Sequence, residues 1–246
     1  MQRLIYTIGN KIFMNEVENE LLQFLKKKNK VIFDVGCYRG FFTKKILKKE
    51  PLNKNRYYLF DPNPNVKEYI KDLIIKKNIN YFEIALDNSN QIKEFTINKY
   101  FEPSGSSLNS SHKKDKLYNL SRRIFFQIFQ PFSRIENYET IKVKTNTLDN
   151  ICKINKIKQI DILKLDTDGN EFEVLMGAKK LLSEGKIKLI YTEISGFKKN
   201  FEFKSNKIIN LLKKYNFSLK KVYPINSFSF LSNLKSTDNL FLKKNI

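Results

Sequence analysis

The chain has 246 residues, 41% of them hydrophobic, so it can bury a full core and we expect one α/β domain. Its two cysteines, Cys37 and Cys152, and its single histidine, His112, are too few for a Cys/His zinc site or a disulfide framework. A reducing, cytoplasmic location is therefore expected, and no stretch has the pattern of a signal peptide or a membrane span.

The formal net charge is +21, which would suit a nucleic-acid partner because lysine and arginine neutralise phosphates. Only six of the 46 basic residues are arginine, and lysine comes together with abundant asparagine and isoleucine. All three are encoded by A/T-rich codons, so a biased genome could raise the charge without selection for a polyanion. The composition therefore favours codon bias over a nucleic-acid partner, and weak peripheral membrane contact stays open.

Strands and helices alternate along the chain. Strands are predicted at 31–35, 57–61, 80–86, 160–166 and 187–194, and helices at 40–50, 64–77, 169–183 and 205–215. Such alternation indicates parallel strands joined by crossover helices, with helices on both faces of one sheet.

Additional strands are predicted where this alternation is interrupted and at the end of the chain, at 92–97, 141–145, 217–223 and 238–244. We expect a single domain over 1–246, with a helical extension at 1–30 and an insertion at 98–140 that could cap the substrate.

Four acids stand where predicted strands end: Asp34, Asp61, Asp166 and Glu193. Ligands of open parallel sheets bind beyond the carboxyl ends of the strands, so these acids are the first candidates for function. The alternative for each of them singly is a helix cap.

The turn after the first strand reads D-x-G-x-x-x-G, with Gly36 and Gly40 as its glycines, and Asp61 follows 21 residues later. An acid at the end of the second strand can accept hydrogen bonds from both hydroxyls of a cofactor ribose. The dinucleotide fingerprint G-x-G-x-x-G is not present, because its central glycine is missing. A cofactor with an amino-acid tail and a sulfonium tolerates the bulkier loop, so the pattern favours S-adenosylmethionine over NAD.

Six segments resemble the FkbM-type methyltransferases in order and spacing: "FDVGCYRGFFT", "LFDPNPN", "SGSSLN", "TNTLDNI", "ILKLDTDGNEFEVLMGA" and "LIYTEI". The resemblance covers roughly residues 30 to 200 and implies a Rossmann-like class I methyltransferase fold. That fold has a mostly parallel seven-stranded sheet, helices on both faces and an antiparallel last strand. It also implies an S-adenosylmethionine-dependent O-methyltransferase, acting on a hydroxyl of a sugar, glycan or other small acceptor.

The resemblance also implies which residues bind the cofactor. It puts Asp34, Gly36 and Gly40 at the methionine moiety, with Asp166 nearby. The ribose and the adenine would lie against the segments that follow the second and third strands, namely Asp61, Pro62, Asn63, Glu83, Ile84 and Ala85.

Catalysis of methyl transfer to a hydroxyl needs a group that removes the hydroxyl proton. Asp166 is the best candidate base, and Glu193 could orient it or share a cation with it, so Asp166 and Glu193 are also the candidate ligands if a metal is used. Lys164 alternates with Asp166 and could be buried near the site, or its charge could extend past a helix into solvent. The family pattern D-x-E-G-x-E has Asp168 in place of its first Glu, which puts a reach of that side chain to metal or substrate in doubt.

The acceptor is expected to contact Ser106, Ser107, Asn109 and Glu171. His112 is a second candidate base, although a histidine in a polar loop is more often solvated. The segment "RRIFFQIFQPF" at 122–132 could cover the acceptor pocket, lie on a membrane or pack on the core.

Two alternatives stay open. An RNA 2′-O-methyltransferase would explain the positive charge and could use Lys164, Asp166 and Glu193 for deprotonation. A noncatalytic cofactor-binding protein would keep Gly36, Gly40 and Asp61, but it would have no need of acids on the fourth and fifth strands.

Overall fold

The structure is a computed structural model of the chain. It describes residues 20–21, 24–25, 29–49, 54–76, 78–98, 106–108, 138–224 and 234–244. The N-terminal extension and the insertion therefore lie mostly outside the described residues. Within the described part, no helix is long and apolar enough to cross a membrane.

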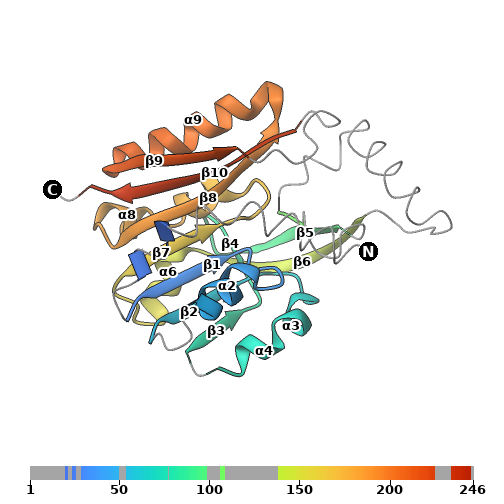
Figure 1. Cartoon of the computed structure of the whole chain (residues 1–246). Helices are drawn as coiled ribbons and strands as arrows, with labels where there is room; N and C mark the ends of the chain where they lie inside the picture. The colour runs from blue at the N-terminus through green and yellow to red at the C-terminus, as the bar shows by residue number, and fades with distance from the viewer. Residues whose placement is uncertain are drawn as a thin grey trace.

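A seven-stranded sheet forms the centre of the structure, in the order β3-β2-β1-β7-β8-β10-β9 (Figure 1). Its strands are β1 (Val31–Val35), β2 (Arg56–Phe60), β3 (Ile79–Phe82), β7 (Ile160–Leu165), β8 (Ile187–Phe197), β9 (Phe217–Pro224) and β10 (Leu234–Lys243). The pairs from β3 to β8 are all parallel, and β10 runs antiparallel to both β8 and β9. The expected mostly parallel sheet with an antiparallel last strand is thereby confirmed.

The two central strands are mostly apolar because both faces of the sheet are covered by helices. β1 (VIFDV) and β7 (IDILKL) are buried along their whole length, and each contains one charged residue near its carboxyl end, Asp34 and Lys164. A charge in such a place is costly unless it is paired, so these two residues draw attention to that edge of the sheet.

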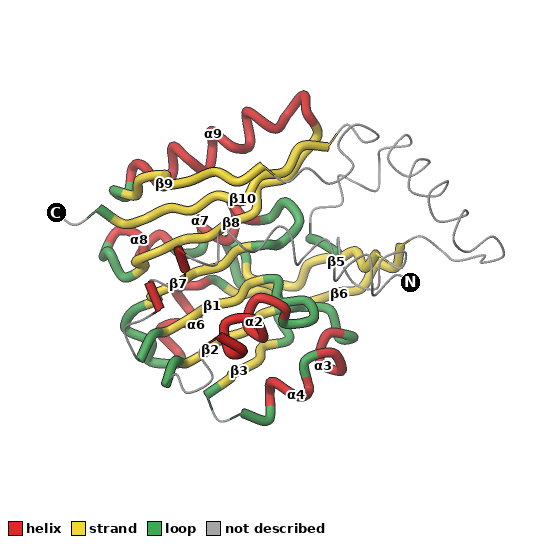
Figure 2. Tube along the Cα trace, in the orientation of Figure 1, coloured by secondary structure: helices red, strands yellow, loops and turns green. Residues whose placement is uncertain are grey.

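Helices cover both faces of the sheet (Figure 2). The helices α2 (Phe41–Lys49), α3 (Val66–Tyr69) and α4 (Lys71–Ile74) contribute Phe42, Val66 and Leu73 to the core on one face. The opposite face is covered by α6 (Leu148–Ile154), α7 (Glu171–Met176), α8 (Lys179–Ser183) and α9 (Lys198–Lys214). The two cores have the sheet between them, and the carboxyl ends of the parallel strands form one common edge.

A second sheet of three strands, in the order β4-β6-β5, lies beside the first (Figure 1). Its strands are β4 (Ala85–Leu86), β5 (Ile92–Asn98) and β6 (Tyr138–Asn146), with β5 antiparallel to β6. Ser107 adds a bridge to β5 opposite Thr96. The insertion thus starts and ends at this small sheet.

Most predicted strands match the structure, and the differences have local causes. The strand predicted at 80–86 is divided, because β3 pairs with β2 whereas Ala85 and Leu86 pair with β6. The helix predicted at 64–77 is interrupted at Ile70, and the one predicted at 169–183 at Ala178. The adjacent Gly177 lies against the backbone of Asp87, where a Cβ atom would be 2.1 Å from the carbonyl oxygen, so close packing requires glycine at this break.

Two further helix predictions need correction. The last helix begins at Lys198 rather than at 205. The helix α6 was missed, although its N-terminus carries a recognisable cap, since the Thr147 side chain accepts a hydrogen bond from the Asn150 backbone N–H.

Candidate active site

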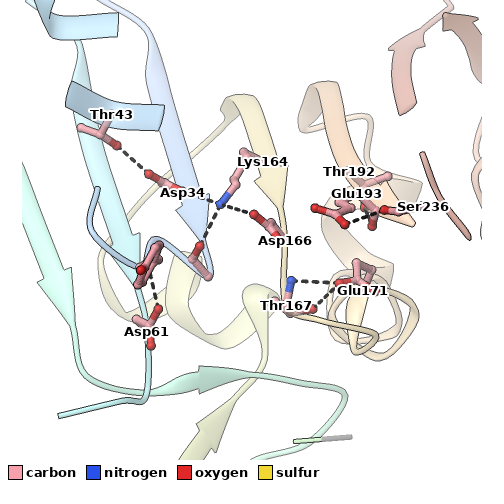
Figure 3. Close-up of polar contacts among 12 residues, drawn as sticks. Asp34, Thr43, Asp61, Lys164, Asp166, Thr167, Glu171, Thr192, Glu193 and Ser236 are labelled. Carbon is pink, nitrogen blue, oxygen red and sulfur yellow. Dashed lines mark hydrogen bonds and ion pairs between the residues drawn. The ribbon is translucent and has the colours of Figure 1, made fainter. Parts of the chain in front are cut away.

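Lys164 is the centre of the polar network at the carboxyl edge of the sheet (Figure 3). Its ammonium group donates a hydrogen bond of 2.8 Å to the carbonyl oxygen of Gly36 and lies 3.1 Å from Asp34 Oδ1 and 3.4 Å from Asp166 Oδ2. Only 6% of the residue is exposed, so the alternative in which this lysine extends into solvent is wrong. One cation therefore joins β1, the loop after it and the end of β7.

The surroundings of Lys164 keep it charged. Burial by itself lowers the pKa of this lysine, but the carboxylates of Asp34 and Asp166 outweigh burial and raise the pKa above its ordinary value. A group that holds its proton so firmly is unsuited to act as a base. Lys164 is thus placed to orient the carboxylates rather than to accept a proton itself.

Asp34 is fully buried at the site, and its second carboxylate oxygen accepts a hydrogen bond of 2.8 Å from the Thr43 hydroxyl on α2. Thr43 follows the glycine loop directly, and nothing in its own sequence pattern distinguishes it from other helix-forming residues. The carboxylate is therefore held from two sides, by α2 and by β7.

The two glycines of the first loop are explained by packing within the protein. A Cβ atom on Gly36 would lie 1.8 Å from the Asp166 carbonyl oxygen, and one on Gly40 would lie 2.6 Å from a methyl group of Leu73. Both glycines also have positive φ angles, +70° and +68°. They let the loop lie directly against the end of β7 and against α4, which brings the cofactor loop and the candidate base together.

Asp61 follows β2 and is buried at the same edge (Figure 3). Its two carboxylate oxygens accept hydrogen bonds from the backbone N–H groups of Tyr38, at 2.9 Å, and Asn63, at 3.1 Å. Burial raises the pKa of this carboxyl to about 6, and the two N–H groups oppose that shift. Each carboxylate oxygen keeps acceptor capacity for a further donor, as the expected role toward two ribose hydroxyls requires.

An unsatisfied donor lies close to Asp61. The side-chain nitrogen of Asn63 is buried and has no hydrogen-bond partner among the described residues, while the amide oxygen accepts from the Asn65 backbone N–H. Buried polar groups are nearly always paired, so an unpaired amide is a place where a bound molecule could supply the partner. The segment Asp61–Asn63 therefore offers both acceptors and a donor, which fits a cofactor with a ribose and an amino acid.

The other residues expected at the ribose and the adenine lie next to Asp61 in the sequence or follow β3, the strand that pairs with β2. Pro62 is half-buried between Asp61 and Asn63, and Glu83 and Ile84 connect β3 to β4. Ala85 is a buried residue of β4, within the small sheet. Tyr81 on β3 donates a hydrogen bond of 3.0 Å to the Asp61 carbonyl oxygen, which ties the end of β3 to the ribose segment. The assignment of these residues to the adenine stays a prediction.

Asp166 and Glu193 differ in their surroundings although both face the same edge. The side chain of Asp166 is 42% exposed and paired with Lys164, whereas Glu193 accepts a short hydrogen bond of 2.6 Å from the Ser236 hydroxyl on β10. Burial raises the pKa of Glu193 well above its ordinary value, and the charges of Asp166 and Asp238 raise it further. Of the two carboxylates, Asp166 is thus the one that is paired with a cation and also accessible from solvent.

Among the described residues, no three side chains of histidine, cysteine, aspartate or glutamate are grouped so that they could hold a metal ion. The structure therefore does not identify Asp166 and Glu193 as metal ligands.

Glu171 holds the turn after β7 in place. One of its carboxylate oxygens accepts hydrogen bonds from the Thr167 backbone N–H and hydroxyl, both at 2.9 Å, and from the Gly169 backbone N–H, at 3.1 Å. Asp168 within this turn has a φ of 53°, a conformation that is uncommon outside glycine. The structure therefore gives Glu171 a supporting role in this turn, and its expected contact with the acceptor stays a prediction.

The hydroxyl groups of Ser106 and Ser107 are engaged within the protein. Ser106 accepts a hydrogen bond from the Asn98 backbone N–H, and Ser107 donates to the carbonyl oxygens of Thr167 and Asp168, at 3.2 and 3.0 Å. This part of the loop lies against the turn after β7, as a position at the mouth of the site requires. Asn109, His112 and the segment 122–132 lie outside the described residues.

Comparisons with known proteins identify relatives of this chain. The chain matches the methyltransferase FkbM domain over residues 34–219. It is 26% identical over 187 residues to 2-O-methyltransferase NoeI of Sinorhizobium fredii, covering 73% of this chain and 69% of that protein.

Two solved structures are among those similar to this chain. The FkbM methyltransferase of Methylobacillus flagellatus KT is 12% identical with a TM-score of 0.47, and the match covers 87% of this chain but only 43% of that one. A SAM-dependent methyltransferase of Aquifex aeolicus is 11% identical with a TM-score of 0.45, and 99% of each chain is covered.

The domain match extends over most of the chain and includes Asp34, Asp61, Asp166 and Glu193, so it spans the whole carboxyl edge of the parallel strands. The predicted enzyme class, an S-adenosylmethionine-dependent methyltransferase, is confirmed by it. The chain belongs to the FkbM methyltransferase family.

Proposed function

We propose that this protein transfers a methyl group to a hydroxyl oxygen of a sugar, a glycan or another small hydroxylated acceptor, with Asp166 as the base. The observation that carries the proposal is the ion pair of Lys164 with Asp166, which holds a half-exposed carboxylate at the end of β7 next to the cofactor loop. A relative named as a 2-O-methyltransferase supports oxygen as the atom that is methylated.

The cofactor would be held by groups from the first two strands and the loops after them. Asp61 would accept hydrogen bonds from the ribose hydroxyls, and the buried amide of Asn63 would gain the partner that it lacks among the described residues. Asp34 and the loop of Gly36 and Gly40 would face the methionine part. S-adenosylmethionine, when bound, supplies an electrophilic methyl group on a sulfonium.

Asp166 would act on the acceptor. A hydroxyl is a weak nucleophile while it keeps its proton, and a carboxylate within hydrogen-bond reach can accept that proton as the oxygen reacts. Lys164 fixes the direction of the carboxylate, because the ammonium is itself anchored on Asp34 and Gly36. Holding the acceptor oxygen in line is expected to provide much of the remaining rate enhancement.

RNA is the second candidate acceptor, and the net charge of +21 is the observation that favours it. A protein that neutralises many phosphates binds RNA with an affinity that falls by roughly 10³-fold or more between 50 and 200 mM salt. We expect only weak binding of RNA that salt screens easily, because nearly all the basic residues are lysine rather than arginine.

The proposal is tested by incubating the protein with S-adenosylmethionine carrying a labelled methyl group and with two sets of acceptors. One set contains mono- and oligosaccharides with free hydroxyls, and the other contains tRNA and rRNA fragments. We expect label on a sugar oxygen, and we expect Asp166→Asn to slow the labelling about 10²-fold or more. Label on RNA, with saturable binding at physiological salt, would replace the sugar by RNA as the substrate class.

A further inference from the structure

Asp238 on β10 is an acid that the motif analysis did not single out, and it lies directly across from Glu193. The register of the antiparallel pair β8–β10 joins Asp238 to Glu193 and Leu240 to Tyr191. Residues directly opposite in such a pair point to the same face of the sheet, with Cβ atoms about 4.5–5.5 Å apart. Figure 2 shows β8 and β10 side by side along this length. The two carboxyl groups are therefore neighbours on the face that also carries Lys164.

Asp238 lies in a poorly solvated part of this face, and Glu193 is half-buried beside it. Asp238 is 7% exposed, and its side chain is hydrogen-bonded to Tyr191. The ring of Tyr191 stacks on the ring of Phe42 in α2, with the ring centroids 6.2 Å apart. From β9, the buried Tyr223 stands opposite Asp238, and its hydroxyl donates to Glu20 at 3.2 Å. Aromatic side chains thus replace much of the water around Asp238. In such surroundings two neighbouring negative charges repel each other strongly.

The charges around the pair do not balance two ionised carboxylates. Asp166 and Asp168 add negative charge on the side of β7, and the hydrogen bond from Ser236 is neutral. Among the described residues, two lysines lie near this face, and both are engaged elsewhere. The ammonium of Lys164 is shared by Asp34 and Asp166, and that of Lys221 lies 3.6 Å from Glu20 and over the Tyr223 ring. Two neighbouring carboxylates without a cation of their own generally retain a proton, as the paired aspartates of acid proteases do.

We propose that Glu193 and Asp238 hold one proton between them across the β8–β10 pair, so that Glu193 meets the acceptor as a neutral carboxyl group and Asp166 remains the ionised base. Asp238 is then a positioning residue that acts through Glu193. This inference rests on the proposed function only for its consequence in catalysis, because the shared proton is a property of the free protein.

The division of roles follows from hydrogen-bond chemistry. An ionised carboxylate only accepts hydrogen bonds, whereas a neutral carboxyl group also donates one. A neutral Glu193 can donate this one proton either to Asp238 or to an acceptor oxygen, but not to both. In the free protein the proton lies between Glu193 and Asp238, and when the acceptor binds, Glu193 donates it to an acceptor oxygen while Asp166 accepts the hydroxyl proton. Burial supports this assignment, since it raises the pKa of Glu193 well above its ordinary value and that of Asp238 to about 7.

The proposal is tested by carbon NMR of the free protein with labelled Asp and Glu carboxyl carbons, titrated from pH 4 to pH 10 in the absence of cofactor and acceptor. We expect the pair to titrate in two separated steps, with one proton still bound at pH 7. In Asp238→Asn, a single step should remain, and it should lie about one pH unit or more below the upper step of the wild type, because the like charge is gone. Glu193→Gln should lower the pH at which Asp238 titrates in the same way, and it provides the second readout if Asp238→Asn does not fold.

Glu202→Gln is the matched control, because Glu202 is an exposed acid paired with Lys235 of β10 outside the cluster. It should leave both steps unchanged. The proposal is overturned if both carboxyl groups are ionised at pH 7, or if the Glu193 step is the same in Asp238→Asn as in the wild type. Calorimetry of the same samples with S-adenosylmethionine separates the two ideas, since absence of cofactor binding would count against the proposed function and leave the proton result standing.

Discussion

The ammonium group of Lys164 lies 3.1 Å from a carboxylate oxygen of Asp34, and this ion pair joins β7 to β1 at the carboxyl edge of the sheet. Both side chains are almost completely buried, so neither charge can be solvated by water if the other is lost. The pair therefore links the cofactor loop to the strand that carries the candidate base, and stability and function depend on the same contact.

Replacing Lys164 by Met should lower the free energy of unfolding by about 3–5 kcal/mol, because the change leaves Asp34 as an uncompensated buried charge. Urea unfolding monitored by circular dichroism measures the loss. Lys180→Met is the control, since Lys180 is exposed and its pair with Glu184 at 3.9 Å is weak. Adding Asp34→Asn to Lys164→Met should restore part of the stability. An unchanged stability of Lys164→Met would mean that the buried pair contributes nothing.

Replacing Asp61 by Ala should weaken S-adenosylmethionine binding by about 1.5–3 kcal/mol, the range for hydrogen bonds to a charged group. The fold should survive, because the side chain lies in a loop and its partners are backbone N–H groups. Isothermal titration calorimetry gives the affinity, with Glu68→Ala as the control at an exposed acid on α3. Equal affinities of the folded Asp61→Ala variant and the wild type would remove Asp61 from the cofactor site.

The affinity for S-adenosylmethionine should depend on pH through Asp61. Its pKa is raised to about 6 in the free protein, so the carboxyl group becomes protonated as the pH falls below 6 and loses acceptor capacity for the ribose hydroxyls. Binding is therefore expected to be strongest above pH 7 and to weaken progressively from pH 6 to pH 5. Calorimetry across this range checks the sign, and Asp61→Ala should remove this dependence. Tighter binding at pH 5 than at pH 7 would be the opposite of what the ionised carboxylate requires.

The stability of the ligand-free protein should fall as the pH rises from about 4 to about 7. Burial raises the pKa of Asp238 to about 7, whereas an aspartate in the unfolded chain titrates near 4, so the folded state binds the extra proton over this range. The stabilisation is fully present below the unfolded pKa and is lost as the folded pKa is approached. Urea midpoints at pH 4.5, 6 and 7.5 measure the trend, which should be shallower in Asp238→Asn. A steeper trend in that variant would show that other groups dominate.

Local sequence patterns were sufficient to predict the parallel part of the sheet and the acids at its edge. Asp34, Asp61 and Asp166 each follow or end a short apolar run, and a strand with its flanking turn is recognisable from about ten residues. The glycine loop was also recognisable, but the reason for it was not. Gly36 is required by the backbone of Asp166, which lies 130 positions further along the chain.

The parts that the sequence did not reveal depend on contacts between distant segments. Asp238 stands in a polar and apolar run that predicts only a strand, and its importance comes from its register with Glu193, which no local pattern specifies. Likewise, the Ser107 hydroxyl contacts the carbonyl oxygens of Thr167 and Asp168, although its sequence context indicates only a polar loop. For Lys164 the two possibilities could be distinguished only by the position of Asp34 on the neighbouring strand.

The most direct test of Asp166 as the base compares methyl transfer by the wild type and by Asp166→Asn at saturating S-adenosylmethionine and acceptor. The amide keeps the size of the side chain and removes its ability to accept a proton, so we expect cofactor affinity close to that of the wild type and a rate of transfer reduced about 10²-fold or more. Full transfer activity in Asp166→Asn, with the methyl group on the same acceptor oxygen, would contradict the assignment of the base and with it the proposed mechanism.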